Sequence, residues 1–152
     1  MDEIVLRSMA KWPDVPDVYG WLALDRRGNW LIRNEKIGNL ALREFISRNY
    51  QPDARGCWYF QNGPQRVFVK LAYTPLVVHH AGEALVDQCG RPFQATGMFL
   101  DDEGSVLFSG TPGAALLDDR DLERYVEHHK TLSKVTRAEA GKRFGFVDDP
   151  KP

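Results

Sequence analysis

Two pairs of adjacent histidines are the residues best suited to chemistry in this chain. His79 and His80 lie in a predicted strand, and His128 and His129 lie in a predicted helix. Imidazole is a common metal ligand and a general base near neutral pH. Because neighbouring side chains diverge in strands and in helices, a site could take only one imidazole from each pair, together with a carboxylate. A metal-binding or hydrolytic enzyme is therefore one alternative for the function.

Other motifs that carry chemistry do not occur in the sequence. Residues 101–104 read Asp-Asp-Glu-Gly, which lacks the alternating spacing of a calcium loop and predicts a hairpin turn instead. There is no glycine-rich phosphate loop and no nucleophile elbow. We assign no catalytic residue, no metal ligand and no cofactor from the sequence, and this favours a protein that is not an enzyme.

Aromatic and arginine side chains are interleaved in the first half of the chain. Such rings beside guanidinium groups can bind a peptide or stack on nucleic-acid bases. The competing interpretation is that the rings form the core of a small sheet while arginine stems cover its edges. The candidate ligand-binding or partner-binding residues are Trp12, Trp21, Arg26, Arg27, Trp58, Tyr59 and Arg66.

The elements that position these residues are mainly hairpins. Period-2 alternation and turn residues predict hairpins over 18–33, 56–73, 76–88 and 93–109, the second one turning at Asn62-Gly63-Pro64. Helical spacing predicts a helix from about 39 to 50, with Asn39 as N-cap. A second helix is predicted near 118–129, with a core-facing row of Leu122, Tyr125, Val126 and His129.

These elements predict one α+β domain over residues 1–152. We expect a mostly antiparallel sheet of six to eight short strands with two helices packed on it. Residues 1–11 are expected to form a short helix or a frayed arm, and 148–152 to fray. The apolar Phe144 or Phe146 is expected to dock on the domain.

An internal repeat is suggested by two similar stretches. Residues 20–32 and 97–108 both read as a hairpin closed by a charged turn that begins with Asp and ends in Gly, and each is followed by an amphipathic helix. The features that the two copies share, namely apolar alternation, a turn that ends in Gly and an apolar helix face, are those that folding requires. Their other side chains differ, with tryptophan and arginine in the first copy and acidic residues in the second. A hairpin-helix duplication and a chance similarity both remain open.

Composition narrows the classes of partner and the compartment. The net charge of −1 gives no global attraction to nucleic acid, and no run of about 18 apolar residues could span a membrane. Cys57 and Cys89 are far apart and fall in no metal-ligand spacing. With no signal-peptide pattern at the start, we expect a cytoplasmic protein with reduced thiols.

Three segments carry a resemblance to a known group of proteins. They are the stretch from Trp12 to Gly28, the stretch from Phe60 to Val67, and the ending Arg143-Phe144-Gly145-Phe146-Val147. Together they look like a small family of uncharacterised proteobacterial proteins, a domain of unknown function, over most of the chain. The resemblance implies a bacterial protein and brings no catalytic residues with it.

The sequence leaves three hypotheses for the function. The first is a non-enzymatic binding or interaction module that uses the aromatic and basic surface, with a protein or peptide as partner. The second is the histidine-based enzyme or metal protein. The third is a structural accessory subunit.

Overall fold

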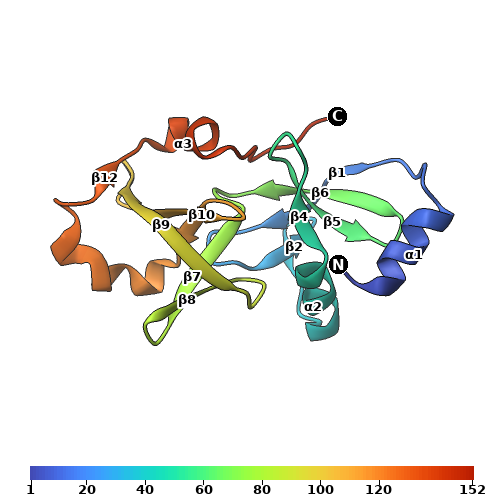
Figure 1. Ribbon diagram of the computed structural model, residues 1–152, viewed down its shortest axis with the longest axis horizontal. Coiled ribbons are helices and arrows are strands. Elements are labelled where there is room, and N and C mark those ends of the chain that lie inside the picture. The colour runs from blue at the N-terminus through green and yellow to red at the C-terminus, as the bar shows by residue number, and fades with distance from the viewer. The chain divides into compact units, whose positions relative to one another are not determined.

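The computed structural model describes residues 1–152, and their contacts group into two compact units. The first unit comprises Met1–Asp25, Asn29–Ala72 and Val147–Pro152. The second comprises Arg26–Gly28 and Tyr73–Phe146. Figure 1 shows the elements of both. The single domain expected from the sequence stays a prediction, and the two units are described in turn.

The first unit is built on a six-stranded sheet in the order β3-β2-β1-β6-β5-β4. Neighbouring strands pair antiparallel except for β1 and β6, which are parallel. The strands are β1 (Val18–Leu24), β2 (Trp30–Ile32), β3 (Glu35–Lys36), β4 (Tyr50–Pro52), β5 (Trp58–Asn62) and β6 (Gln65–Leu71). The predicted hairpins over 18–33 and 56–73 are therefore present.

Aromatic rings form the core of this unit. Trp30 meets Tyr50 edge-on, and Tyr50 packs on Trp58, with ring centroids 4.8 Å apart in both pairs. Helix α2 (Leu40–Arg48) packs near β5 through a Phe45–Phe60 ring contact. The predicted N-cap is confirmed, since the side chain of Asn39 accepts the N–H of Leu42. Of the two alternatives for residues 1–11, the short helix is the one observed, as α1 (Glu3–Lys11).

The second unit closes on itself. Its sheet runs β10-β11-β7-β8-β9-β12, and a further pairing of β10 with β9 joins five strands into a ring. Closure removes the exposed edges that an open sheet would leave on those strands. The strands are β7 (Leu76–Ala81), β8 (Ala84–Asp87), β9 (Pro92–Leu100), β10 (Val106–Thr111), β11 (Ala115–Leu117) and β12 (Ser133–Lys134).

The second predicted helix is wrong in type and in its core face. Residues Asp119–His128 form a 3₁₀ helix, η1, with no buried residue, and Val126 is 58% exposed. A 3₁₀ helix has three residues per turn, so side chains three apart are eclipsed. Leu122 and Tyr125 stay together on one face, whereas Val126 turns toward solvent.

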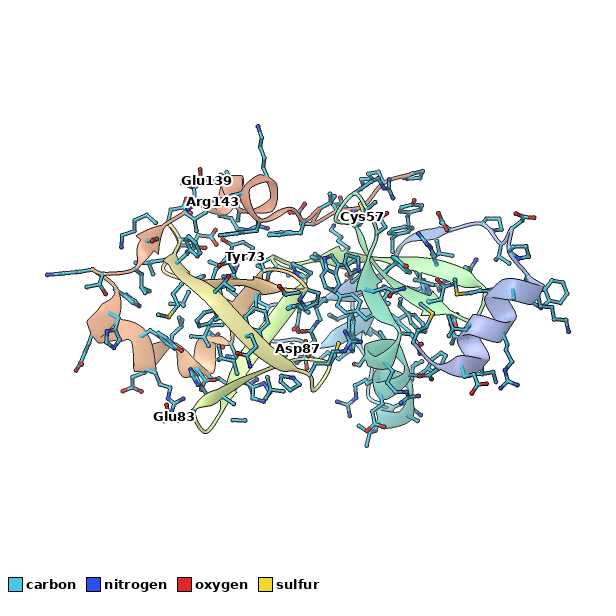
Figure 2. The ribbon with its side chains drawn as sticks, in the orientation of Figure 1. Cys57, Tyr73, Glu83, Asp87, Glu139 and Arg143 are labelled. Carbon is cyan, nitrogen blue, oxygen red and sulfur yellow. The ribbon has the colours of Figure 1, made fainter.

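The C-terminal part carries a helix of its own. Thr136 and Glu139 form a reciprocal capping box at the start of α3 (Arg137–Phe144), and Gly145 ends the helix in the left-handed conformation. Glu139 and Arg143 both project from this helix (Figure 2). Phe146 is buried, which confirms the expected docking of the ending. Val147–Pro152 belong to the first unit, where the carbonyl of Asp148 accepts the N–H of Leu71.

One turn design recurs four times. Residues 25–29, 53–57, 87–91 and 101–105 each begin with Asp and carry Gly at the fourth position. In every case the Asp Oδ1 accepts the backbone N–H four residues on, at 2.7–3.1 Å. The four glycines have φ between 80° and 83°. The turns of the two suggested copies, 25–29 and 101–105, are thus two of four similar turns. The next helix after the first copy is the α-helix α2, whereas the next helix after the second copy is the 3₁₀ helix over Asp119–His128.

The α+β class is confirmed, and the finer description needs correction. Most strand pairs are antiparallel, as expected, but β1–β6, β7–β11 and β9–β12 are parallel, so both sheets are mixed. There are two sheets rather than one, with twelve strands rather than six to eight and four helices rather than two. The strands that pattern analysis misses are short, and β11 is buried at all three residues, so it shows no alternation. No helix is both long enough and apolar enough to cross a membrane.

Candidate functional site

The candidate site of the first unit begins at helix α1 and the segment that follows it. Glu3 in the first turn and Lys11 in the last suit the helix dipole. The helix ends at Trp12 because Pro13 biases its predecessor away from helical geometry. Residues 13–17 then run extended, and the side chain of Gln65 donates to the carbonyl of Pro16 at 2.9 Å. This bond ties the lead-in segment to β6.

The β5–β6 hairpin supplies the other side of the site. Tyr59 pairs with Phe68, and Gln61 pairs with Arg66, so these four side chains lie on one face of the sheet. On that face Tyr19 stacks on Phe68 with centroids 4.8 Å apart. The guanidinium of Arg66 lies 4.4 Å from the ring centroid of Tyr59. Gln61 and Arg66 thus occupy the end of an aromatic layer next to the hairpin turn.

Between these two parts lies a cavity of about 390 Å³, which we call the Trp12 pocket. Figure 1 shows α1 beside the hairpin end of β5 and β6, where the pocket forms. Three polar side chains line it, namely Asp17, Gln61 and Arg66. The apolar lining consists of Met9, Trp12, Pro13, Val15 and Pro64.

Gln61 holds an acceptor without a partner at this pocket. The residue is only 1% exposed, and its Oε1 is buried with no hydrogen bond. Its Nε2 donates to the carbonyl of Gly63 at 3.0 Å, which sets the orientation of the amide, because the flipped form would bring two acceptors together. A buried acceptor left unsatisfied costs about 1–3 kcal/mol.

The two charged groups of the pocket are not paired with each other. Asp17 is exposed and has no ion pair, while Arg66 makes its contact with the Tyr59 ring. Elsewhere in this unit arginines do pair, as in Arg48 with Asp2 and Arg55 with Asp53. The Arg48 hydrogen bond holds the pKa of Asp2 below its usual value. Asp17 and Arg66 are therefore available to a ligand.

The structure brings two of the seven predicted site residues together. Trp12, 56% exposed, lines the pocket with Arg66. Trp58 is buried in the aromatic core, and Tyr59 is buried beneath Arg66. Trp21 is half-buried on β1 and does not line the pocket.

The other two predicted arginines belong to the second unit. Arg26 donates to Ser105 at 2.7 Å and lies 5.1 Å from the ring centroid of Tyr73. Arg27 forms an ion pair with Asp119 at 3.0 Å. Both guanidinium groups thus bind acidic and polar partners within that unit rather than extending the pocket surface.

The histidines of the alternative hypothesis are placed in different surroundings. His79 is exposed, and His80 Nε2 lies 2.6 Å from the hydroxyl of Tyr125. His128 is exposed, and His129 is half-buried. No group of three or more His, Cys, Asp and Glu side chains is arranged to hold a metal ion.

The hydroxyl of Tyr73, in the second unit, has a strongly raised pKa. Its hydroxyl donates to Asp101 Oδ2 at 2.8 Å, and Arg137 lies 4.0 Å from its ring centroid. Burial, followed by the hydrogen bond to Asp101, raises the pKa of Tyr73 far above its usual value. Figure 2 marks this residue. At 1% exposure the ring is closed to ligands, and we assign it a structural role.

The cysteines offer little reactivity. Neither forms a disulfide bond, and Cys57 is buried in a cluster with Tyr59 and Phe68. Burial raises the pKa of the Cys57 thiol, which disfavours the reactive thiolate.

Sequence reasoning missed two of the three polar residues of the pocket, Asp17 and Gln61. In the structure, Gln61 has a buried acceptor without a partner and Asp17 has no ion pair. Neither residue belongs to a motif that would mark it in the sequence. A usable clue was that Gln61 continues the run Trp58-Tyr59-Phe60 on the same face as Tyr59. A polar side chain at an inward position of a strand needs hydrogen-bond partners. For Gln61 the fold provides a partner for Nε2 and none for Oε1.

Comparisons with known proteins show the fold and the family. No curated protein matches. A DUF1285 family protein from Silicibacter pomeroyi DSS-3 has a TM-score of 0.56 and 16% identity, over 78% of this chain and 74% of that one. A DUF1285 family protein from Shewanella baltica OS155 has a TM-score of 0.53 and 14% identity, over 70% of this chain and 90% of that one. At such identities the likeness concerns the fold alone.

The resemblance to an uncharacterised family is confirmed. Both similar structures come from proteobacteria and belong to a family without an assigned activity. Residues 1–143 match the DUF2944 family, described as "Protein of unknown function (DUF2946)", and the chain belongs to that family.

Proposed function

We propose that this protein is a non-enzymatic binding module whose site is the Trp12 pocket. The observation that carries the proposal is Gln61, which lines the pocket and whose buried Oε1 has no hydrogen-bond partner. A fold that leaves this acceptor unsatisfied loses stability, and a ligand that donates to it recovers that loss.

The pocket offers groups that bind rather than react. A guanidinium has no acceptor, and an amide is neutral, so Arg66 and Gln61 are groups suited to hydrogen bonding rather than to proton transfer. The exposed ring of Trp12 and the neighbouring prolines provide rigid apolar surface. The cavity is near the lower end of the range of about 300–1,000 Å³ for ligand sites, so it suits a small molecule or a single residue of a peptide.

An NMR titration of the ¹⁵N-labelled full chain tests the proposal. The probes are L-phenylalanine, L-phenylalaninamide, N-acetyl-L-phenylalanine and N-acetyl-L-phenylalaninamide, which share one ring and differ in their charged ends. We expect at least one probe to shift the indole N–H of Trp12 and the side-chain amide of Gln61. The buried indole of Trp30, which donates to Ser47, serves as the internal reference and stays unchanged.

Two variants make the result specific. Gln61→Met removes the free acceptor and is expected to weaken binding. Lys70→Gln changes an exposed charge on the same strand as Arg66, outside the pocket, and is expected to bind like the natural protein. If all four probes leave the Trp12 and Gln61 signals unmoved up to their solubility limits, the proposed function is wrong.

We also propose that the protein works in the bacterial cytoplasm. Neither cysteine is in a disulfide bond, and the buried thiol of Cys57 lies in an apolar cluster, as suits a compartment that keeps thiols reduced. Cell fractionation with an antibody to the chain tests this placement.

A further inference from the structure

The pocket contains three uncommitted polar groups of different kinds around one apolar wall. Gln61 presents a neutral acceptor, Asp17 an anion and Arg66 a cation. We propose, on the basis of the binding function above, that the ligand is a zwitterionic α-amino acid with a large apolar side chain. Each part of such a molecule has a counterpart among these residues.

The ammonium end meets Gln61 and Asp17. An ammonium carries three donors and no acceptor, so it can satisfy Gln61 Oε1 and still donate to the Asp17 carboxylate. A neutral donor would satisfy the amide oxygen but gain nothing from the charge of Asp17. Hydrogen bonds between charged partners are stronger than those between neutral ones.

The carboxylate end meets Arg66. A guanidinium presents a planar fork that binds a carboxylate through two parallel hydrogen bonds. Stacking on Tyr59 at 4.4 Å holds this fork in one orientation before the ligand arrives. A neutral amide at this end of the ligand would lose the charge and one of the two acceptors.

The spacing of the two ends fits one amino acid. Gln61 and Arg66 are directly opposite each other in the β5–β6 ladder. Such pairs have Cβ atoms about 4.5–5.5 Å apart, so their polar ends can reach two groups attached to a single carbon atom. The side chain of the ligand would then lie along Met9, Trp12 and Val15.

The same ammonium could come from the N-terminal residue of a peptide, and the same carboxylate from a C-terminal residue. The unpaired cation of Arg66 and the unpaired anion of Asp17 together favour the free amino acid, which alone carries both charges on one residue. The four phenylalanine probes separate these sources. L-phenylalaninamide stands in for a peptide N-terminus, and N-acetyl-L-phenylalanine for a peptide C-terminus.

Dissociation constants from the NMR titration test the ligand class. We expect L-phenylalanine to bind at least about tenfold more tightly than either singly charged probe, since each lacks one charge-assisted contact. Arg66→Gln should abolish the preference over L-phenylalaninamide, and Asp17→Asn should reduce the preference over N-acetyl-L-phenylalanine. Arg66→Lys keeps the charge but loses the fork, and should retain part of the preference. Lys70→Gln should change none of these ratios.

The outcomes distinguish the ligand class from the binding function. If L-phenylalaninamide or N-acetyl-L-phenylalanine binds as tightly as L-phenylalanine, the zwitterion proposal is overturned while the pocket stands as a binding site. If the four probes all fail to move the pocket signals, both proposals fall. Circular dichroism of each variant checks its fold, and the comparison of Asp17→Asn with Arg66→Lys decides the matter even if Arg66→Gln does not fold.

Discussion

At the scale of single residues, two glutamines show how differently the fold treats the same side chain. Gln61 has one of its two polar ends satisfied. Gln88 has both, because its Oε1 accepts the N–H of Val77 at 2.9 Å and its Nε2 donates to the carbonyl of Pro75 at 3.0 Å. The first arrangement leaves capacity for a ligand, and the second is complete in itself.

This contrast predicts unequal costs for one substitution. Gln88→Met removes two hydrogen bonds and leaves the N–H of buried Val77 unsatisfied, so we expect the free energy of unfolding to fall by about 1–3 kcal/mol. Gln61→Met removes one bond together with the unsatisfied oxygen, and we expect a change below about 1 kcal/mol. Urea unfolding of both variants measures the difference. Equal losses would show that Gln61 is already satisfied in the free protein.

A second residue-level prediction concerns pH. The hydrogen bond from Arg120 Nε to Asp118, at 2.9 Å, is the main cause that holds the pKa of Asp118 below its usual 3.8. A carboxyl with a lowered folded pKa contributes stability that is fully present above its unfolded pKa. That contribution is lost as the pH falls through the folded value.

We therefore expect Arg120→Gln to weaken the dependence of stability on pH from about pH 5 downward. Chemical unfolding at a series of acidic pH values measures this slope. Arg43→Gln, an exposed substitution on α2, serves as the control and should leave the slope unchanged. Parallel curves for Arg120→Gln and the natural protein would contradict the assignment.

At the scale of elements, the four Asp-x-x-Gly turns form half of the eight connections between consecutive paired strands. Each needs a glycine at positive φ, where a Cβ costs about 1–2 kcal/mol. The surroundings differ, however. A Cβ on Gly28 would come within 2.8 Å of the Gln88 Cβ, whereas one on Gly90 or Gly104 would meet nothing within 4 Å.

Gly28→Ala should consequently destabilise the protein more than Gly104→Ala does. Gly104→Ala has only the energetic cost of a Cβ at positive φ. Gly28→Ala has the same cost and in addition a clash with the Cβ of Gln88, which cannot rotate away. Thermal unfolding of the two variants, with Gly90→Ala as a second open position, gives the ranking. A smaller effect at Gly28 than at Gly104 would mean that this contact relaxes freely.

At the scale of the whole molecule, the two units stabilise their strands in different ways. The sheet of the first unit is open and ends in the short strands β3 and β4. In the second unit β7 to β11 form a closed ring, with β12 attached outside it. Backbone groups inside a closed ring have partners on both sides, whereas those of an edge strand have partners on one.

Amide hydrogen exchange should follow this difference. We expect the N–H groups of β3 and β12 to exchange fastest among the strands, because both are two-residue exposed edges. Those of β7 and β10 should exchange slowest in the second unit. Exchange read by NMR or mass spectrometry provides the test, and strong protection of β12 would argue against its placement as an outer strand.

Much of the local structure could be predicted from the sequence. The hairpins, the Asn39 cap and the docking of Phe146 follow from side-chain alternation, capping chemistry and apolar content, which act over a few residues. The α+β class follows from the same patterns. Of the candidate site, Trp12 and Arg66 were identified because aromatic and arginine side chains stand out by type alone.

Only the tertiary structure decided the rest. The parallel pairing of β7 with β11 that closes the ring, the parallel pairing of β1 with β6, and the meeting of Asp17 with Gln61 and Arg66 all join residues distant in the chain. Local patterns specify which face of an element is apolar, but not which other element will cover it. Whether Gln61 finds one hydrogen-bond partner or two depends on that long-range packing, so local patterns alone could not show that this residue keeps an unsatisfied acceptor.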